Sequence, residues 1–457
     1  MVSGIVNGQQ GHHDLRRDLI AGHAEGAAYG GMVGLGETYL PAFVLAVGLG
    51  EITAGLVASV PLLAGGLMQM ISPAAIGRLA SHKAWVLVCA LAQALSFVPL
   101  VVAALWGGIS APAVLLVATL YWGAGLATGP AWNTWMGALV PRPLRARFFA
   151  ERTRLSQLAV LAGFLVGGAA LQWVGSRDAV LLAFAGLFLA AGLCRVVSFA
   201  LLALQAEPVP LASGMRRIPL GRAWGQIRRA GSGPLLAYLV VVQGVVQVSG
   251  PYFTPYMFEK LDLSYARYVV LLSAAFVAKI VLLPVWGRMA HRVGAIRLLW
   301  LGGVGIVPTA GLWIVSDGFA WLFFIQVLAG AVWAAYELGF FLMFFESIPE
   351  DDRTGVLTFY NLANTAAWVL GSAAGGLLLY SLGTARIGYL LLFGISSAGR
   401  AAALLLLWRV PATVVPAAAV GVRTVGVRPM TASIDAPILP ALPDQAPPPV
   451  EDHAQAP

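Results

Sequence analysis

Two stretches of the sequence decide the fold: residues 141–168 read PRPLRARFFAERTRLSQLAVLAGFLVGG, and residues 349–376 read PEDDRTGVLTFYNLANTAAWVLGSAAGG. Five positions recur in the same order and at the same spacing, namely Pro141, Arg145, Gly163, Gly167 and Gly168 in the first and Pro349, Arg353, Gly371, Gly375 and Gly376 in the second. In both, a charged loop that begins with proline leads into an apolar segment with a face of small residues. Five positions in one register predict an internal duplication.

Two shorter pieces follow the same duplication. Gly77-Arg78-Leu79-Ala80 recurs as Gly287-Arg288-Met289-Ala290, and Tyr39-Leu40-Pro41 recurs as Phe253-Thr254-Pro255. The chain is therefore predicted to consist of two copies of one unit.

Composition indicates that this unit lies in a membrane. Hydrophobic residues make up 59% of the 457 residues, charged residues make up 11%, and the mean hydropathy is +0.82. A soluble fold could not shield so much apolar surface from water, whereas apolar surface that faces lipid needs no such shielding. Cys89 and Cys194 both lie in apolar runs, so neither a disulfide framework nor a metal site is indicated. We find no catalytic set and no nucleotide-binding loop, and we expect no enzyme activity, no cofactor and no nucleic-acid partner.

Apolar runs long enough to span roughly 30 Å of hydrocarbon predict twelve transmembrane helices. In the first half they lie near 26–48, 52–76, 84–106, 111–138, 155–174 and 179–203, and in the second half near 234–258, 264–286, 294–315, 319–347, 355–382 and 386–408. The predicted segments are an N-terminal tail (1–25), a six-helix bundle (26–203), a basic linker (204–233), a second six-helix bundle (234–409) and a disordered Pro/Ala-rich tail (410–457). The predicted class is an all-α polytopic membrane protein with two pseudo-symmetric bundles.

Lysine and arginine collect on one side of this layout. Of the 28 such residues, only Arg177, Lys260, Arg267 and Arg386 lie in loops on the other side, and Arg195, Lys279 and Arg400 lie within expected helices. Because cytoplasmic loops are enriched in Lys and Arg, we expect both termini and the linker to be cytoplasmic, with the chain in the cell (inner) membrane.

At this point the sequence resembles the major facilitator superfamily. The family carries Gly-x3-Asp-Arg-x-Gly after helices 2 and 8. The second copy here, Gly287 to Gly294, matches except that His291 replaces Asp, and the first copy, which starts at Gly77, has Ser81 there. In helix 5, Gly163-Phe164-x2-Gly167-Gly168 resembles the antiporter signature Gly-Pro-x2-Gly-Gly with Phe in place of Pro. The resemblance covers about residues 26–409 and implies a monomeric carrier with one central site, which works by alternating access.

Three charged residues within the expected helices are candidates for proton coupling. A charge at mid-helix costs roughly 2.5–3.5 kcal/mol on insertion scales, so such residues favour a functional interpretation. Glu37 lies in the first helix, which the resemblance places on the central cavity; burial favours its neutral form, so it can exchange a proton as it is alternately wetted and buried. Glu337 and Lys279 lie at similar depth in helices 10 and 8 and could form an ion pair. The alternatives are a Glu37 held by hydrogen bonds between helices, and a Glu337 and Lys279 that snorkel or bond to backbone.

Polar and aromatic side chains of helices 1, 4 and 7 are candidates for a substrate cavity; they are Tyr39, Trp132, Asn133, Gln243, Gln247, Tyr252 and Tyr256. Gln243 and Gln247 share one helical face, and Trp132 and Asn133 could stack on and hydrogen-bond to a ligand. Packing between helices explains the glutamines equally well, and anchoring at the membrane interface explains Trp132 better.

The duplicated loops supply candidates for gating, namely Gly77, Arg78, Arg145, Gly287, Arg288, Arg292 and Arg353. The repeated glycines Gly163, Gly167, Gly168, Gly371, Gly375 and Gly376 are predicted to pack against neighbouring helices. Arg195 and Arg400 occupy similar places in helices 6 and 12, and we interpret both as snorkelling to the cytoplasmic surface.

The pattern as a whole predicts a secondary transporter of a small solute, driven most readily by protons because no ATP-binding loop is present. A uniporter, or a sensor or scaffold of the same fold, is the alternative. Costly acids within the helices favour a carrier over a scaffold.

Overall fold

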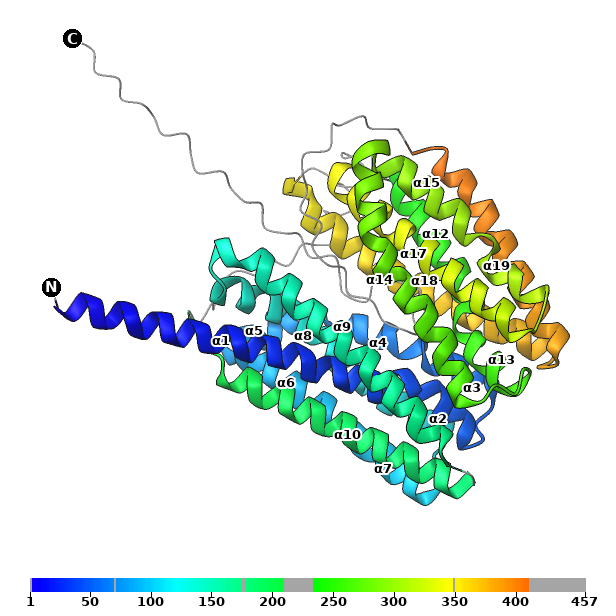
Figure 1. Ribbon diagram of the computed structural model, residues 1–457, viewed down its shortest axis with the longest axis horizontal. Helices are drawn as coiled ribbons and strands as arrows, with labels where there is room; N and C mark the ends of the chain where they lie inside the picture. The colour runs from blue at the N-terminus through cyan, green and yellow to red at the C-terminus, as the bar shows by residue number, and fades with distance from the viewer. Residues whose placement is uncertain (1, 70, 175–176, 209–232, 348–349, 411–457) are drawn as a thin grey trace, which may run out of the picture.

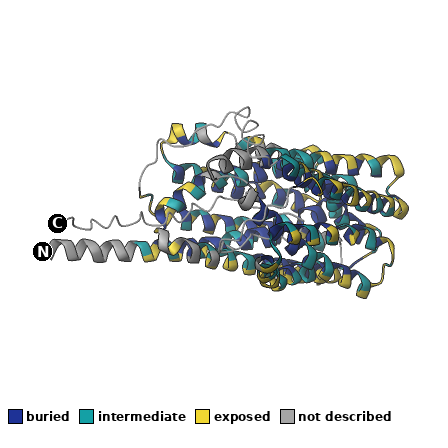
Figure 2. Cartoon of the chain, turned by 90° about the horizontal axis from the view of Figure 1, so that it is seen from above, coloured by how far each residue is buried: buried dark blue, intermediate teal, exposed yellow. Residues whose placement is uncertain are grey.

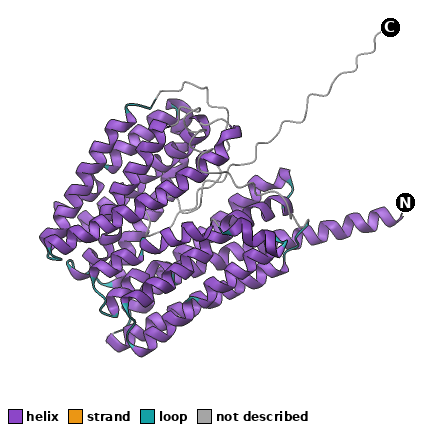
Figure 3. Ribbon diagram, turned by 180° about the vertical axis from the view of Figure 1, so that it is seen from behind, coloured by secondary structure: helices purple, strands orange, loops and turns teal. Residues whose placement is uncertain are grey.

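The computed structural model describes residues 2–69, 71–174, 177–208, 233–347 and 350–410. Within these ranges the chain is helical almost throughout and has no strand, in agreement with the predicted all-α class (Figure 3). Helices are the expected solution for a single apolar segment in lipid, because they satisfy every backbone N–H and C=O internally.

Each half of the chain forms one bundle of long helices with short connections (Figure 1). The first half contains α1 (Val2–Leu35), η1 (Glu37–Tyr39), α2 (Leu40–Ala46), α3 (Glu51–Val57), α4 (Val60–Gln69), α5 (Ser72–Leu79), α6 (His82–Leu95), α7 (Phe97–Trp106), α8 (Ala111–Leu139), α9 (Arg142–Gln172) and α10 (Arg177–Leu204). The second half contains α12 (Gly233–Ser249), η2 (Gly250–Tyr252), α13 (Phe253–Glu259), α14 (Tyr265–Val293), α15 (Ala295–Ile306), α16 (Pro308–Gly311), η3 (Leu312–Ile314), α17 (Phe319–Ser347), α18 (Glu350–Leu382) and α19 (Arg386–Leu407).

Ten of the twelve expected spans are present in the described residues as helices long and apolar enough to cross a membrane. They correspond to the expected spans from 84–106 to 386–408. The first two expected spans, 26–48 and 52–76, are divided into shorter helices, α1–η1–α2 and α3–α4–α5. Prolines explain part of this division, since Pro41, at the start of α2, has no N–H to donate to the preceding turn.

The two halves repeat the same break in their first helix. In the first half η1 separates α1 from α2, and in the second half η2 separates α12 from α13. Pro41 follows the first break and Pro251 lies within the second. Corresponding breaks in corresponding helices support the duplication that the sequence predicts.

The repeated glycines lie where helices approach each other closely. A Cβ atom at Gly371 would lie 2.0 Å from the carbonyl oxygen of Gly244, and one at Gly375 would lie 2.1 Å from that of Val248. The other repeated glycines likewise leave no room for a larger side chain: Gly163 faces the backbone of α1, Gly167 faces Tyr39, Gly168 faces Val269 and Gly376 faces Tyr252. Small residues at these positions let α9 pack on α1 and α18 pack on α12.

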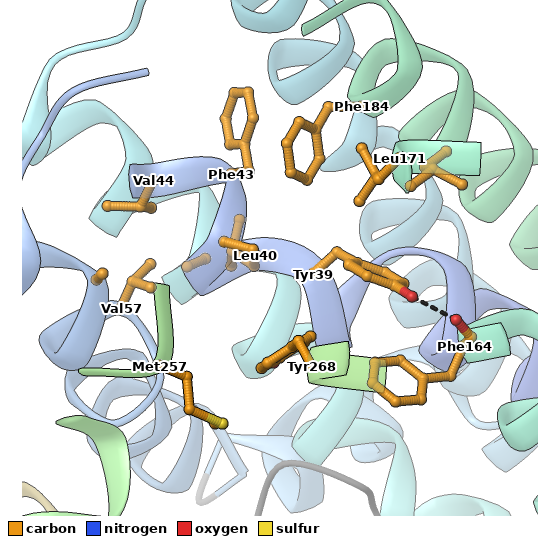
Figure 4. Close-up of a cluster of buried hydrophobic side chains, with 14 of the residues drawn as sticks. Tyr39, Leu40, Phe43, Val44, Val57, Phe164, Leu171, Phe184, Met257 and Tyr268 are labelled. Carbon is orange, nitrogen blue, oxygen red and sulfur yellow. Dashed lines mark hydrogen bonds between the residues drawn. The ribbon is translucent and has the colours of Figure 1, made fainter. Parts of the chain in front are cut away.

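Among the residues that the structure describes, the apolar core is shared between the halves at one end of the molecule. We call this the distal end; it carries the turns at 47–50, 260–264 and 383–385, and the opposite, terminal end carries the N-terminus (Figure 1). A single cluster of buried residues at the distal end includes Tyr39 and Phe164 of the first half and Met257 and Tyr268 of the second (Figure 4). Toward the terminal end each half has a core of its own, around Trp135 and around Tyr336.

Exposure follows the membrane pattern. Buried residues lie within each bundle, and exposed residues line its outer surface (Figure 2). Large aromatic side chains are exposed at the distal helix ends, namely Trp106, Trp173 and Tyr380, and Trp408 is exposed at the end of α19. Aromatic residues at such positions are typical of membrane–water interfaces.

Candidate functional site

The break in the first helix positions Glu37. Glu37 is the first residue of η1, and Tyr121 of α8 donates a hydrogen bond to its Oε2 at 2.7 Å. The two residues line a small pocket with Phe97, Leu100 and Ala118. An acid that is partly shielded from water between two helices, with a hydroxyl partner, has the surroundings needed to gain and lose a proton when its access to water changes.

Tyr39, two residues further on, has a different environment. It is fully buried, its hydroxyl donates to the carbonyl oxygen of Phe164, and its ring packs beside Tyr268 of the other half (Figure 4). Tyr39 therefore belongs to the shared distal core in this conformation.

In the second half, α14 and α17 bring Lys279 and Glu337 together. Lys279 Nζ donates to Glu337 Oε1 at 2.6 Å, and the two side chains are only 8 and 4% exposed. Their similar depth in the sequence pattern predicted this ion pair. Each charge compensates the other, because a lone charge at this depth would carry the full cost of desolvation.

The substrate-cavity candidates of α12, η2 and α13 are buried as well, and the two tyrosines among them have hydrogen-bond partners. Tyr252 donates to the carbonyl oxygen of Ser372 at 2.7 Å, and Tyr256 donates to Asp317 Oδ1 at 3.3 Å. Gln243 and Gln247 are buried on α12, and Gln243 Oε1 has no hydrogen-bond partner in the described residues. An unpaired buried amide oxygen is costly, so Gln243 is the member of this group best suited to meet a polar ligand.

Trp132 and Asn133 both have partners in this structure. Asn133 Nδ2 donates to Gly129 O of its own helix at 2.7 Å. The guanidinium of Arg152 lies over the Trp132 ring, 4.3 Å from its centroid, and also donates to Glu25. The sequence did not single out Glu25 or Arg152, because Glu25 falls at the edge of the first apolar run and Arg152 reads as one of many loop arginines.

The snorkelling interpretation of Arg195 and Arg400 is wrong. Arg195 is buried, donates to Ser198 Oγ and lies 3.9 Å from Glu25. Arg400 is also buried and donates to Ile306 O, Thr309 Oγ1 and Ser249 Oγ. Arg195 finds its partners one turn further along α10 and on α1, and Arg400 finds its partners on α12, α15 and α16, which the sequence pattern of a single helix does not reveal.

The gating candidates lie in the terminal-end turns of helices and not in loops, as the sequence had suggested: Gly77 and Arg78 in α5, Arg145 in α9, Gly287, Arg288 and Arg292 in α14, and Arg353 in α18. Arg78, Arg288 and Arg292 are exposed, and a Cβ atom at Gly77 or Gly287 would meet nothing within 4 Å. The side chains of Arg145 and Arg353 lie outside the described part of the structure. The carboxylate missing at Ser81 is supplied from elsewhere: Glu207 accepts hydrogen bonds from Ser81 Oγ at 2.6 Å and from the backbone N–H of His82 at 2.9 Å.

A third group of polar contacts joins the two halves at the distal end, and no sequence pattern indicated it. Glu51 at the start of α3 binds Lys260 Nζ at 2.8 Å and accepts a hydrogen bond from Tyr389. Nearby, Ser59 Oγ and Ser372 Oγ are 2.5 Å apart. We call these residues (Glu51, Ser59, Lys260, Ser372 and Tyr389) the distal lock.

Comparisons with known proteins agree with this architecture. The sequence model of the Major Facilitator Superfamily matches residues 235–442. The structure is similar to those of the nucleoside transporter NupG (TM-score 0.62, 14% identity, 86% of this chain and 97% of that chain), a bacterial homologue of the lysosomal transporter Spinster (0.56, 14%, 87% and 94%) and a bacterial homologue of the iron transporter ferroportin (0.55, 16%, 86% and 98%). No curated protein matches the sequence significantly. At such identities the structural likeness shows the fold, which spans both halves of the chain.

Proposed function

We propose that the chain, whose second half matches the sequence model of the Major Facilitator Superfamily, is a membrane transporter that moves a small solute by alternating access and couples this movement to protons. It works as a monomer in the inner membrane, with both termini in the cytoplasm and the distal end outside. This orientation rests on the excess of Lys and Arg at the terminal end.

The distribution of the core carries this proposal. The two halves share apolar packing at the distal end and have separate cores at the terminal end. This is the arrangement expected of a carrier whose halves are closed on one side of a central site and apart on the other. In the opposite state the distal lock opens and the terminal ends meet.

Proton coupling is supported by the acids held inside each half. Glu37 accepts a hydrogen bond from the Tyr121 hydroxyl and lines a small pocket, whereas Glu337 is held in a buried ion pair with Lys279. A carboxylate that must leave a buried ion pair to take up a proton is the less suitable carrier of the two. Glu37 is therefore the proposed proton carrier, and Lys279–Glu337 holds α14 to α17.

Locking the distal end tests alternating access. Ser59→Cys and Ser372→Cys are introduced together after Cys89 and Cys194 have been replaced by alanine, and the protein is reconstituted in proteoliposomes. A panel of small solutes is offered under an imposed pH gradient, and solute uptake and internal pH are followed. We expect uptake with proton movement in the reduced state, loss of uptake on oxidation, and recovery on reduction.

Each other outcome contradicts a stated part of the proposal. Equal uptake by oxidised and reduced protein excludes opening at the distal lock. Uptake without proton movement identifies a uniporter, and no uptake of any solute in either state favours a sensor or scaffold. The single variants Ser59→Cys and Ser372→Cys control for the effect of the oxidant.

A further inference from the structure

A cluster of charges within the first half has no part in the function proposed so far. Arg152 of α9 donates to Glu25 Oε2 of α1 at 2.5 Å, and Arg195 of α10 lies 3.9 Å from Glu25 Oε1. Ser198 donates to the same carboxylate at 3.0 Å. Gly26 lets Arg152 lie against α1, since a Cβ atom there would be 2.7 Å from Arg152 Cγ.

The charges of this cluster do not balance. The described contacts set two guanidiniums against one carboxylate, and Arg195 Nε is buried without an acceptor. Uncompensated positive charge is expensive away from water, so the cluster has the electrostatics of a site that is one anion short. Glu151, the neighbour of Arg152 in the chain, lies 3.7 Å from His23 Nε2.

Only one member of the cluster is open to a ligand. Glu25 and Arg195 are 3 and 2% exposed, whereas Arg152 is 16% exposed. Arg152 also extends over the Trp132 ring of α8, so its guanidinium joins α8 to α1, the helix that the family resemblance places on the central cavity. The accessible face of the positive charge therefore has an aromatic surface beside it.

We propose that Arg152 and Trp132 bind the anionic end of the transported solute, an organic carboxylate or phosphate monoester with an apolar or aromatic body. The guanidinium offers a planar fork of donors that matches either group, and the indole supports the apolar part. The incoming anion competes with Glu25 for Arg152, and Arg195 with Ser198 retains Glu25. This inference rests on the proposed transport function and specifies the chemical class of its substrate.

Ligand binding is measured without transport. Purified full-length protein in an uncharged detergent is titrated, at constant ionic strength, with benzoate, phenyl phosphate, benzamide or benzylammonium, and the thermal unfolding midpoint is followed. We expect benzoate or phenyl phosphate to raise the midpoint, and the neutral and cationic compounds to leave it unchanged. Equal effects of benzoate and benzamide, or no effect of either anion, overturn the proposal.

Variants distinguish a binding site from a structural cluster. Arg152→Gln should weaken anion binding about tenfold or more, the value of a charged hydrogen bond, while Arg154→Gln, exposed one half-turn away, should bind like the wild type. Glu25→Gln should tighten binding several-fold, because it removes the internal competitor. If the cluster only holds helices together, Glu25→Gln lowers the unfolding midpoint and leaves anion affinity unchanged. Should Arg152→Gln not fold, Arg152→Lys replaces it and is expected to keep the preference for anions at lower affinity.

Two further outcomes separate the possible sources of the anion and the two proposals. Stabilisation by dihexanoyl phosphatidylglycerol through Arg152, with none by benzoate or phenyl phosphate, assigns the cluster to lipid headgroups and overturns a solute site. If anions bind through Arg152 but the protein moves no solute, the anion site stands and the transport proposal is refuted. If the disulfide between Ser59→Cys and Ser372→Cys controls uptake but no anion binds, the transport proposal stands and the anion site is refuted.

Discussion

Replacing one member of the Lys279–Glu337 pair should lower the free energy of unfolding more than replacing both members. The two side chains are 8 and 4% exposed and 2.6 Å apart. At an effective dielectric constant near 20 their attraction is roughly 6 kcal/mol, and desolvation of the two ions offsets most of it. Lys279→Met or Glu337→Gln alone leaves one buried charge without a counter-ion, at a cost of about 3–5 kcal/mol. The double variant loses the attraction and the desolvation cost together, so its free energy of unfolding should lie within about 1 kcal/mol of the wild type.

Reversible denaturation in mild detergent measures all three variants. The exposed pair Arg386–Asp317 is the matched control; its side chains are 52 and 37% exposed, and Asp317→Asn should cost at most about 1 kcal/mol. If the two single costs simply add in the double variant, the pair does not act as a unit, and the argument from burial fails.

Three further predictions concern packing, coupling and orientation. Gly371→Leu should prevent α18 from packing on α12 and abolish folded protein in size-exclusion profiles, whereas Gly186→Leu, where nothing lies within 4 Å, should fold normally. Glu37→Gln should abolish accumulation of solute against its gradient and preserve exchange at equal pH, because exchange needs no net proton transfer; accumulation at the normal rate would exclude Glu37 as the proton carrier, and Glu337→Gln is the control. Cysteines placed at Ser110 and Asp317 should react with an impermeant thiol reagent from outside and one at Pro208 should not; the reverse pattern would invert the orientation.

Much of the fold could be predicted because its causes are local. Long apolar runs and the repeated Pro–Arg–Gly spacing are read directly from the chain, and ten expected spans appear in the described residues as helical segments long enough to cross a membrane, some with short breaks such as η2. The first two spans are divided by turns at Gly36 and at 58–59, which change hydrogen bonding without changing hydropathy. Composition therefore locates these segments and does not show that they are divided.

The site residues show the same distinction between features that are local in the sequence and features that depend on tertiary structure. The sequence could suggest an ion pair between Lys279 and Glu337, because each is a charge in an apolar helix and the two lie at similar depth. Glu25 and Glu51 fall just before the first two expected spans, 26–48 and 52–76, where charges are common and carry no signal. Their partners, Arg195 and Lys260, come from distant helices, so only tertiary structure shows that these residues meet.

The strengths of the polar contacts fit a molecule whose halves move as units. The buried charged groups, Lys279–Glu337 and the Glu25–Arg152–Arg195 cluster, each lie within one half, where separating them would cost several kcal/mol. The distal lock, in contrast, joins the halves through one partly exposed ion pair and a few hydroxyl hydrogen bonds, each worth on the order of 1 kcal/mol. On the proposed rocking motion the polar contacts that must break are therefore the weak ones, and they break together with the apolar core that the halves share at the distal end.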